Sequence, residues 1–154
     1  MKKIITEELV DLNMEVKDYE EAIHLLAKKI NASDRLHNFD GYYQSVLERE
    51  RLTSTGIGFG IAIPHGKCPH VKETTVAFGR IRDAINWESL DGEDVTIVFL
   101  LAVPEACKGD EHLRIIASLS RKLIHKDFRE KLITAESKEN IVDLLSESLI
   151  EATA

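Results

Sequence analysis

A glycine-rich, apolar stretch runs from Thr55 to Lys67 with the sequence T-G-I-G-F-G-I-A-I-P-H-G-K, and it contains a single histidine, His65, near its end. The apolar, partly β-branched residues Ile61 to Ile63 predict a buried strand, which Pro64 ends because proline has no N–H for the ladder. We therefore expect His65 to leave the sheet edge. Gly66 lacks a Cβ, so it would permit a positive φ and the close approach of a phosphate or of a second protein's backbone. The pattern predicts an unhindered imidazole that acts as a nucleophile.

Two familiar phosphate-binding motifs do not fit this stretch. The glycines give G-x-G-x-G, and the last glycine of the dinucleotide motif G-x-G-x-x-G would fall on Ile61. The Walker A spacing would also need a glycine at Ile61, and it would place Cys68 where a Ser or Thr holds magnesium. The sequence therefore gives little support to nucleotide binding, and we expect no cofactor.

Two separated blocks of the chain resemble the type-2 IIA domains of the bacterial phosphoenolpyruvate-dependent sugar phosphotransferase system. The first block contains Glu48-Arg49-Glu50, Leu52 to Gly56 and then G-I-A-I-P-H-G-K. The second contains W-E-S-L-D-G from Trp87, the strand-like run 95–104 and G-D-E-H-L from Gly109, and it resembles the fructose-type members. Together the blocks span most of the chain, so the resemblance covers residues 1–154 as one domain.

The resemblance implies a phosphocarrier. By the matching positions, His65 takes a phosphoryl group from the phosphohistidine of the carrier protein HPr and passes it to a IIB domain, while Arg49 and His112 flank the phosphohistidine. The partners also include a membrane-embedded IIC component, and the branch resemblance favours uptake of fructose. An alternative is a regulatory protein like the family's nitrogen-related branch, in which the phosphorylation state of the histidine controls binding to partner proteins. A phosphohistidine hydrolase fits less well, because that chemistry would show Arg-His-Gly where this chain has Pro-His-Gly.

The chemistry of phosphoryl transfer needs few groups. An ordinary histidine is roughly three-quarters neutral at pH 7, so His65 needs no general base. A phosphoryl group of about -1.5 to -2 charges then calls for donors, and Arg49, His112 and main-chain N–H groups are the candidates. Without the resemblance, we would interpret Arg49 as an ordinary solvated charge on a helix. We would interpret His112 as a surface or capping residue at a helix start, where the helix dipole disfavours the charged imidazolium.

Helical and strand patterns alternate along the chain, which favours an α/β fold. The resemblance implies a single domain with a central mixed β-sheet flanked by helices on both faces. Apolar spacing predicts helices over Tyr19 to Ile30, Gly41 to Glu50 and Glu111 to Ile124, followed by two closing helices, the last of them capped by Ser137. Strands are predicted over Thr74 to Ile81 and Val95 to Val103, and the unbroken apolar run of the second indicates a central strand buried on both faces.

The composition favours a small cytoplasmic domain. The chain has 154 residues, of which 44% are hydrophobic, and no apolar run approaches the roughly 18 residues of a membrane span. The formal net charge of -7 argues against nucleic acid as a partner. Cys68 and Cys107 are too few for a disulfide framework.

Two further features remain open to more than one interpretation. His65, Cys68 and His70 could suggest a metal site, but three ligands on a proline-interrupted loop with no fourth lead us to expect no metal. Phe59, a large aromatic residue inside the glycine run, is compatible with a core position and equally with an exposed apolar rim for a docking partner.

Overall fold

The computed structural model describes residues 3–106 and 110–153, which form helices on both faces of a six-stranded mixed sheet. The strands are β1 (Val10–Met14), β2 (Gly56–Gly58), β3 (Ile61–Ala62), β4 (His65–Cys68), β5 (Thr75–Ile85) and β6 (Val95–Pro104). The helices are the 3-10 helix η1 (Glu7–Leu9), α1 (Tyr19–Ala32), α2 (Phe39–Leu52), α3 (Glu111–Leu123), α4 (Lys126–Thr134) and α5 (Lys138–Thr153). Cys107 and Gly109, the latter part of the G-D-E-H-L motif, lie outside the described residues.

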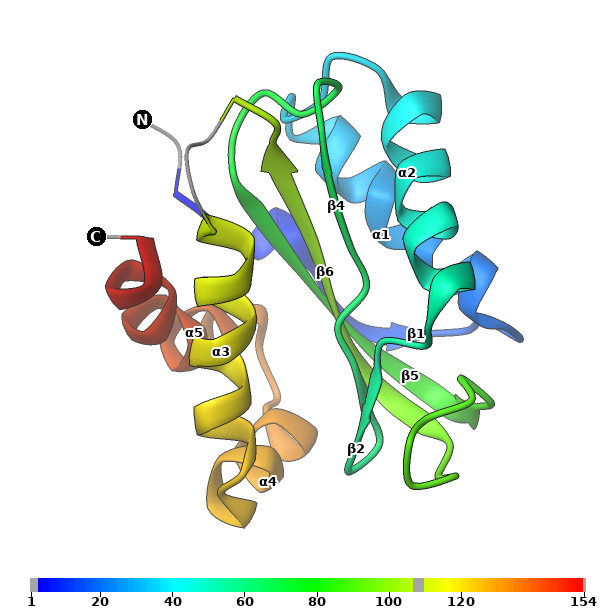
Figure 1. The fold of residues 1–154 in the computed structure, drawn as a ribbon. Helices are drawn as coiled ribbons and strands as arrows, with labels where there is room; N and C mark the ends of the chain where they lie inside the picture. The colour runs from blue at the N-terminus through cyan, green and yellow to red at the C-terminus, as the bar shows by residue number, and fades with distance from the viewer. Residues whose placement is uncertain (1–2, 107–109, 154) are drawn as a thin grey trace.

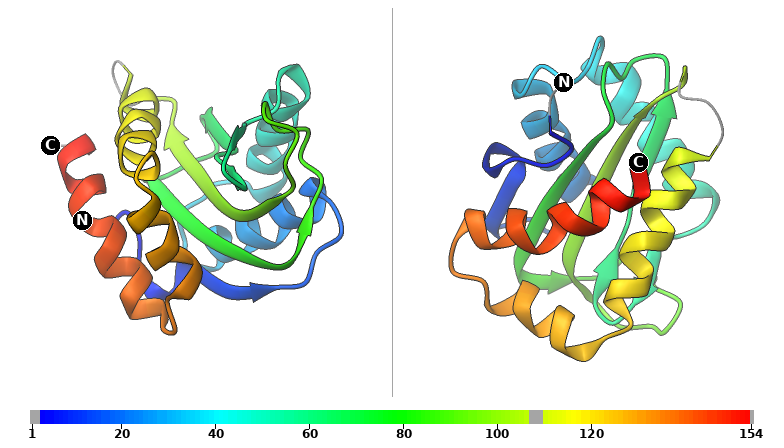
Figure 2. Two further views of the ribbon diagram at one scale, coloured as in Figure 1. Left: turned by 90° about the horizontal axis from the view of Figure 1, so that it is seen from below. Right: turned by 90° about the vertical axis from the view of Figure 1, so that its left-hand side faces the viewer.

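The sheet separates two groups of helices, with α1 and α2 on one side and α3, α4 and α5 on the other (Figure 1). The left view of Figure 2, turned by 90°, shows the same separation. On the first face α1 packs on β5 and β6, and α2 packs on β4. On the second face α3 packs on β6 and α5 on β1, and these two helices also pack against each other. The predicted α/β fold with helices on both faces is therefore confirmed.

Strand β6 lies at the centre of the sheet, as its apolar sequence predicts. It pairs antiparallel with β5 on one side and parallel with β3 and β4 on the other. Strand β1 continues the sheet in parallel beyond β5, and β2 continues it antiparallel beyond β3. Residues 97–103 of β6 are all buried, because helices cover both faces of the sheet at this point.

Pro64 interrupts the strand but does not end it. Ala62 pairs with Val98, and His65 already pairs with Leu101, so pairing with β6 resumes directly after the proline. The expectation that the chain leaves the sheet at His65 is wrong, since this residue begins β4. The physical reason is that proline lacks only the N–H donor: the carbonyl of Pro64 still accepts the N–H of Leu101 at 3.0 Å.

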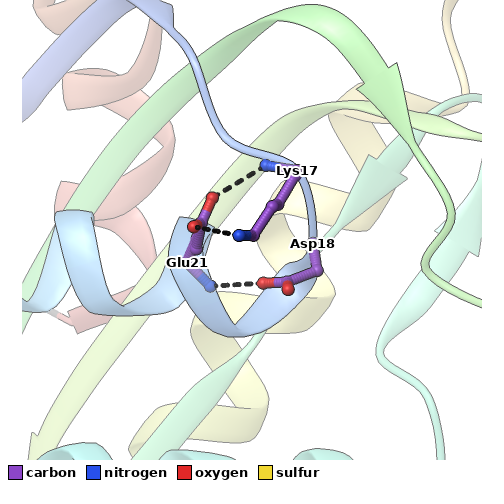
Figure 3. A network of polar contacts seen from close by, with 3 residues as sticks. All are labelled: Lys17, Asp18 and Glu21. Atoms are coloured by element: carbon purple, nitrogen blue, oxygen red, sulfur yellow. Dashed lines mark hydrogen bonds and ion pairs between the residues drawn. The ribbon is translucent and has the colours of Figure 1, made fainter.

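Helix α1 begins at a well-defined cap that also shows how acidic side chains serve helix starts in this chain (Figure 3). The Asp18 carboxylate accepts the N–H of Glu21 at 2.8 Å, and the Glu21 carboxylate accepts the N–H of Lys17 at 2.9 Å. The Lys17 ammonium lies 3.7 Å from the second carboxylate oxygen of Glu21. The bond from Asp18 satisfies one of the N–H groups that a helix start leaves without intrahelical partners, and the contacts of Lys17 hold the residue before the cap against the first turn.

The predicted helices are all present, and the ends of the first three lie within two residues of the predicted ones. The predicted cap at Ser137 is confirmed, since its hydroxyl accepts the N–H of Asn140 at 3.1 Å. Among the described residues no helix combines the length and the apolar character that crossing a bilayer requires.

Candidate active site

His65 is the first residue of β4, and its ring is oriented by the residue two positions earlier. Its Nδ1 lies 3.0 Å from the carbonyl oxygen of Ile63. A carbonyl can only accept, so Nδ1 carries the proton and donates it. The lone pair of the neutral ring is then on Nε2, the nitrogen that can attack a phosphorus atom.

The surroundings of His65 favour the neutral, nucleophilic form. Burial lowers the pKa of the His65 imidazole from its ordinary value, and the charge of Arg49, together with that of His112 when its ring is protonated, acts in the same direction. The hydrogen bond to the Ile63 carbonyl raises the pKa but does not cancel the other effects. His65 is therefore neutral at pH 7 and available as an acceptor.

His112 lies in the first turn of α3, as predicted, and its ring reaches His65. The ring centroids of His65 and His112 are 6.1 Å apart, with the ring planes inclined by 36°. Burial and the ammonium of Lys67 lower the pKa of the His112 imidazole, while the Asp110 carboxylate raises it. The direction agrees with the expectation from the helix dipole, although burial and Lys67 are the main causes. Its Nδ1 is buried and has no hydrogen-bond partner among the described residues.

Arg49 lies in the last turn of α2, which packs directly on β4. Its Nη1 donates to the carbonyl oxygen of Thr53 at 2.9 Å, so the guanidinium also satisfies a carbonyl just beyond the helix end. Arg49 and His112 thus come from the two helical layers on opposite faces of the sheet, and both act electrostatically on His65. The structure brings together all three of the predicted site residues.

Two residues that the sequence did not single out belong to the same neighbourhood. Burial alternates along β4, so Lys67 shares the half-open face of the strand with His65, whereas Gly66 and Cys68 are buried on the opposite face. Assignment of β4 as a strand would have revealed this alternation. Glu50, buried in the last turn of α2, is the second residue.

Gly66 has a different role from the predicted one. Its φ does not lie in the left-handed region, and a Cβ at this position would come within 2.9 Å of Val46 Cγ2 and 3.2 Å of Tyr42 Cε1. The glycine therefore lets α2 approach β4 closely, and the expectation that it opens space for a phosphate is wrong. Tyr42, fully buried beside it, donates its hydroxyl to the carbonyl of Leu101 at 2.8 Å.

Phe59 is exposed at the turn of the β2–β3 hairpin, which excludes the core position as its interpretation. Its side chain is 55% exposed, and the Arg129 guanidinium lies 4.1 Å from the ring centroid. The backbone has φ of 59°, between glycines whose φ values are also positive. The Asp91 carboxylate accepts the Phe59 N–H at 3.1 Å, which ties the hairpin to the W-E-S-L-D-G segment.

In the described part of the chain, no three His, Cys, Asp or Glu side chains lie close enough together to hold a metal ion. His65 and Cys68 point to opposite faces of β4, which explains why their sequence proximity does not produce a ligand set.

Comparison with known proteins identifies relatives over nearly the whole chain. Residues 3–148 match the family model described as "Phosphoenolpyruvate-dependent sugar phosphotransferase system, EIIA 2". The chain is 40% identical over 140 residues to the "PTS system fructose-specific EIIA component" of Haloferax volcanii, covering 91% of this chain and 90% of that protein.

Two solved structures share the fold of this chain. The nitrogen regulatory protein IIA-Ntr from Neisseria meningitidis superposes with a TM-score of 0.85 at 34% identity, over 92% of this chain and 96% of that one. The enzyme IIAMtl of Escherichia coli, solved in complex with phosphorylated enzyme IIBMtl, gives a TM-score of 0.80 at 25% identity, over 93% and 97% of the two chains.

Proposed function

The chain belongs to the EIIA 2 family of the phosphoenolpyruvate-dependent sugar phosphotransferase system, and we propose that His65 is the residue that carries its phosphoryl group. In this role the domain takes the group from phospho-HPr and passes it to a IIB domain, the kind of partner with which IIAMtl was solved. The observation that carries the proposal is the hydrogen bond from His65 Nδ1 to the Ile63 carbonyl, because it leaves the lone pair on Nε2.

Transfer from HPr is then a displacement at phosphorus. The lone pair of His65 Nε2 forms the new N–P bond while the bond from phosphorus to the donor histidine breaks and its electron pair returns to the donor ring. No proton has to leave Nε2, because the proton of the neutral ring is already on Nδ1. After transfer the ring gains positive character, and the Nδ1–H bond to the Ile63 carbonyl stabilises it. Passing the group to IIB repeats the displacement with His65 as the leaving group.

Arg49 supplies positive potential for this step, and Arg49 and His112 both supply hydrogen-bond donors. The phosphoryl oxygens share about -1.5 to -2 charges, which preorganised donors stabilise better than water does. The guanidinium of Arg49 is permanently charged, and a neutral His112 can donate one N–H. We assign both residues to stabilisation of the phosphoryl group and not to its acceptance.

The substrate and the cellular location are further parts of the proposal. The fructose-specific relative from Haloferax volcanii supports a fructose-type pathway. We also propose that residues 1–154 act as one IIA domain in the cytoplasm, where it accepts the phosphoryl group from HPr and passes it to a IIB domain that works with a membrane-embedded IIC component. The proposed reaction requires neither a cofactor nor a metal ion.

A phosphorylation assay tests the assignment of His65. Incubation with phosphoenolpyruvate, enzyme I and HPr should yield one acid-labile, base-stable phosphate per chain, the behaviour of a phosphohistidine. His65→Ala should abolish the adduct, and His37→Ala, which alters an exposed histidine, should retain it as the matched control. Uptake of a full equivalent of phosphate by His65→Ala would show that another residue is the acceptor.

A regulatory role is the second candidate, supported by the TM-score of 0.85 and the 34% identity to IIA-Ntr. In that case the phosphorylated and unphosphorylated forms would bind different partner proteins. Mixing the phosphorylated protein with a IIB domain separates the possibilities: movement of phosphate to IIB supports the carrier, retention supports the regulator, and rapid release to water indicates a hydrolase.

A further inference from the structure

The hydrogen bond that sets the tautomer of His65 depends on a residue outside the sheet ladder. Ile63 lies between Ala62, the last residue of β3, and the interruption at Pro64, so it does not pair with β6. Its N–H donates to the carbonyl oxygen of Thr55 at 3.0 Å, and its own carbonyl accepts from His65 Nδ1. Thr55 therefore anchors Ile63, the residue whose carbonyl accepts from His65 Nδ1.

Thr55 is in turn held by Glu50 of the last turn of α2. The Glu50 carboxylate accepts the Thr55 N–H at 2.7 Å, and its other oxygen accepts the Thr55 hydroxyl. Glu50 is only 7% exposed and Thr55 is equally buried. Both sides of Thr55 are thus fixed, its N–H and hydroxyl by Glu50 and its carbonyl by Ile63.

We propose that Glu50 is a positioning residue for the nucleophile, acting through Thr55 and Ile63 to hold the His65 ring with Nε2 toward the phosphoryl donor. This inference rests on the proposed function, because it assigns Glu50 a part in the same transfer. The links pass through different peptide groups of each residue, so Glu50 acts by fixing position and not by polarising one continuous chain of bonds.

The placement of Glu50 supports a role beyond packing. A buried carboxylate loses its hydration, and at a helix C-terminus the dipole also disfavours a negative charge. An apolar side chain would avoid both costs but could not accept two hydrogen bonds from Thr55. The neighbouring Glu48 is exposed and illustrates the ordinary position of an acidic residue on this helix.

The first test replaces Glu50 in the full chain and reads out both the ring and the reaction. In Glu50→Ala the ¹⁵N shifts of the His65 ring should move toward a mixture of tautomers, and transfer from phospho-HPr should slow by roughly 10- to 100-fold, because a misplaced reacting group costs rate. Glu50→Gln should retain most of the wild-type ring shifts and most of the transfer rate, because glutamine can accept the Thr55 N–H and donate to the Thr55 hydroxyl oxygen. Glu48→Ala is the matched control and should match the wild type.

Thr55→Val keeps the test decisive if Glu50→Ala fails to fold. Valine preserves the shape and the N–H but loses the hydroxyl, so the ring shifts and the rate should change in the same direction by a smaller amount. Wild-type ring shifts and rates in folded Glu50→Ala or Thr55→Val would overturn the inference, as would a slower rate with an unaltered ring. Failure of the proposed function is distinguishable, because the wild type itself would then take no phosphate on His65.

Discussion

At the scale of single residues, the neutrality of His65 has a consequence for pH dependence. Only the neutral ring accepts a phosphoryl group, and its fraction falls as the pH drops through the pKa of the folded protein. Burial together with Arg49 and His112 lowers that pKa below the usual value of about 6.5. We expect an NMR titration of the His65 ring to have its midpoint below pH 6.5, and phosphate uptake to persist into the same range. A midpoint at or above 6.5 would contradict the structure.

The two flanking residues should affect the rate and leave the fold intact. Arg49→Ala and His112→Ala each remove one donor near the phosphoryl oxygens, so transfer from phospho-HPr should slow by roughly 10- to 1,000-fold in single-turnover measurements. Because the Arg49 charge lowers the pKa of His65, Arg49→Ala should also raise the midpoint of the His65 titration. Wild-type rates in both variants would remove these residues from the mechanism.

That His65, Arg49 and His112 lie near one another could be predicted from the sequence, because each lies in a motif of the family resemblance. Glu50 lies in the same E-R-E block, yet its role could not be predicted, since its burial and its bonds to Thr55 exist only in the folded chain. Lys67 shares a face with His65 only because both belong to β4. Chemistry that depends on which face a side chain occupies stays hidden until the strand itself is recognised.

At the scale of secondary structure elements, α2 approaches β4 so closely that residue 66 has no room for a side chain. Gly66→Ala would bring a Cβ within 2.9 Å of Val46 Cγ2, and overpacking of this kind costs about 1–3 kcal/mol. Urea unfolding should show a loss of stability in that range. Combining it with Val46→Ala should cost less than the sum of the two single changes, because the smaller side chain leaves room for the new methyl group. Strict additivity would show that the two positions do not compete for space.

The elements with strong periodicity were predictable, whereas β4 was not. Helices α1 to α3 follow from apolar residues at helical spacing, and β6 follows from its unbroken apolar run. Strand β4 has the sequence His-Gly-Lys-Cys, which carries little intrinsic preference for a strand and follows a proline. Its conformation is imposed by pairing with β6, a tertiary interaction that local sequence does not encode.

At the scale of the whole molecule, the proposed relay requires one histidine to serve two partners in turn. If His65 carries the phosphoryl group, phospho-HPr and IIB must each bring a reactive group to it, so we expect their footprints on the domain to overlap. The exposed side chain of Phe59, at the turn between β2 and β3, offers an apolar contact for such partners. A small, transient interface would permit rapid exchange of partners.

NMR titration of the labelled domain with each partner checks this expectation. HPr and IIB should perturb one common set of amides between Gly56 and Lys67, and an excess of one should displace the other. Simultaneous binding at separate surfaces would be incompatible with a relay through a single histidine.

Because the backbone at Phe59 is left-handed, the side chain at the tip of this hairpin can be replaced with little effect on the stability of the fold. An aromatic residue with φ of 59° carries strain of roughly 1–2 kcal/mol that glycine would relieve. Phe59→Gly also loses the contact with Arg129, which is worth about 0.5–1 kcal/mol. In addition, glycine loses more conformational freedom on folding, which lowers the free energy of unfolding by roughly 0.5–1 kcal/mol. These effects nearly cancel, so the free energy of unfolding should change by less than about 1 kcal/mol while the affinity for HPr and IIB falls. A large loss of stability would contradict this. If the expected docking role holds, substitutions at residue 59 should adjust the strength of partner binding without a redesign of the scaffold beneath it.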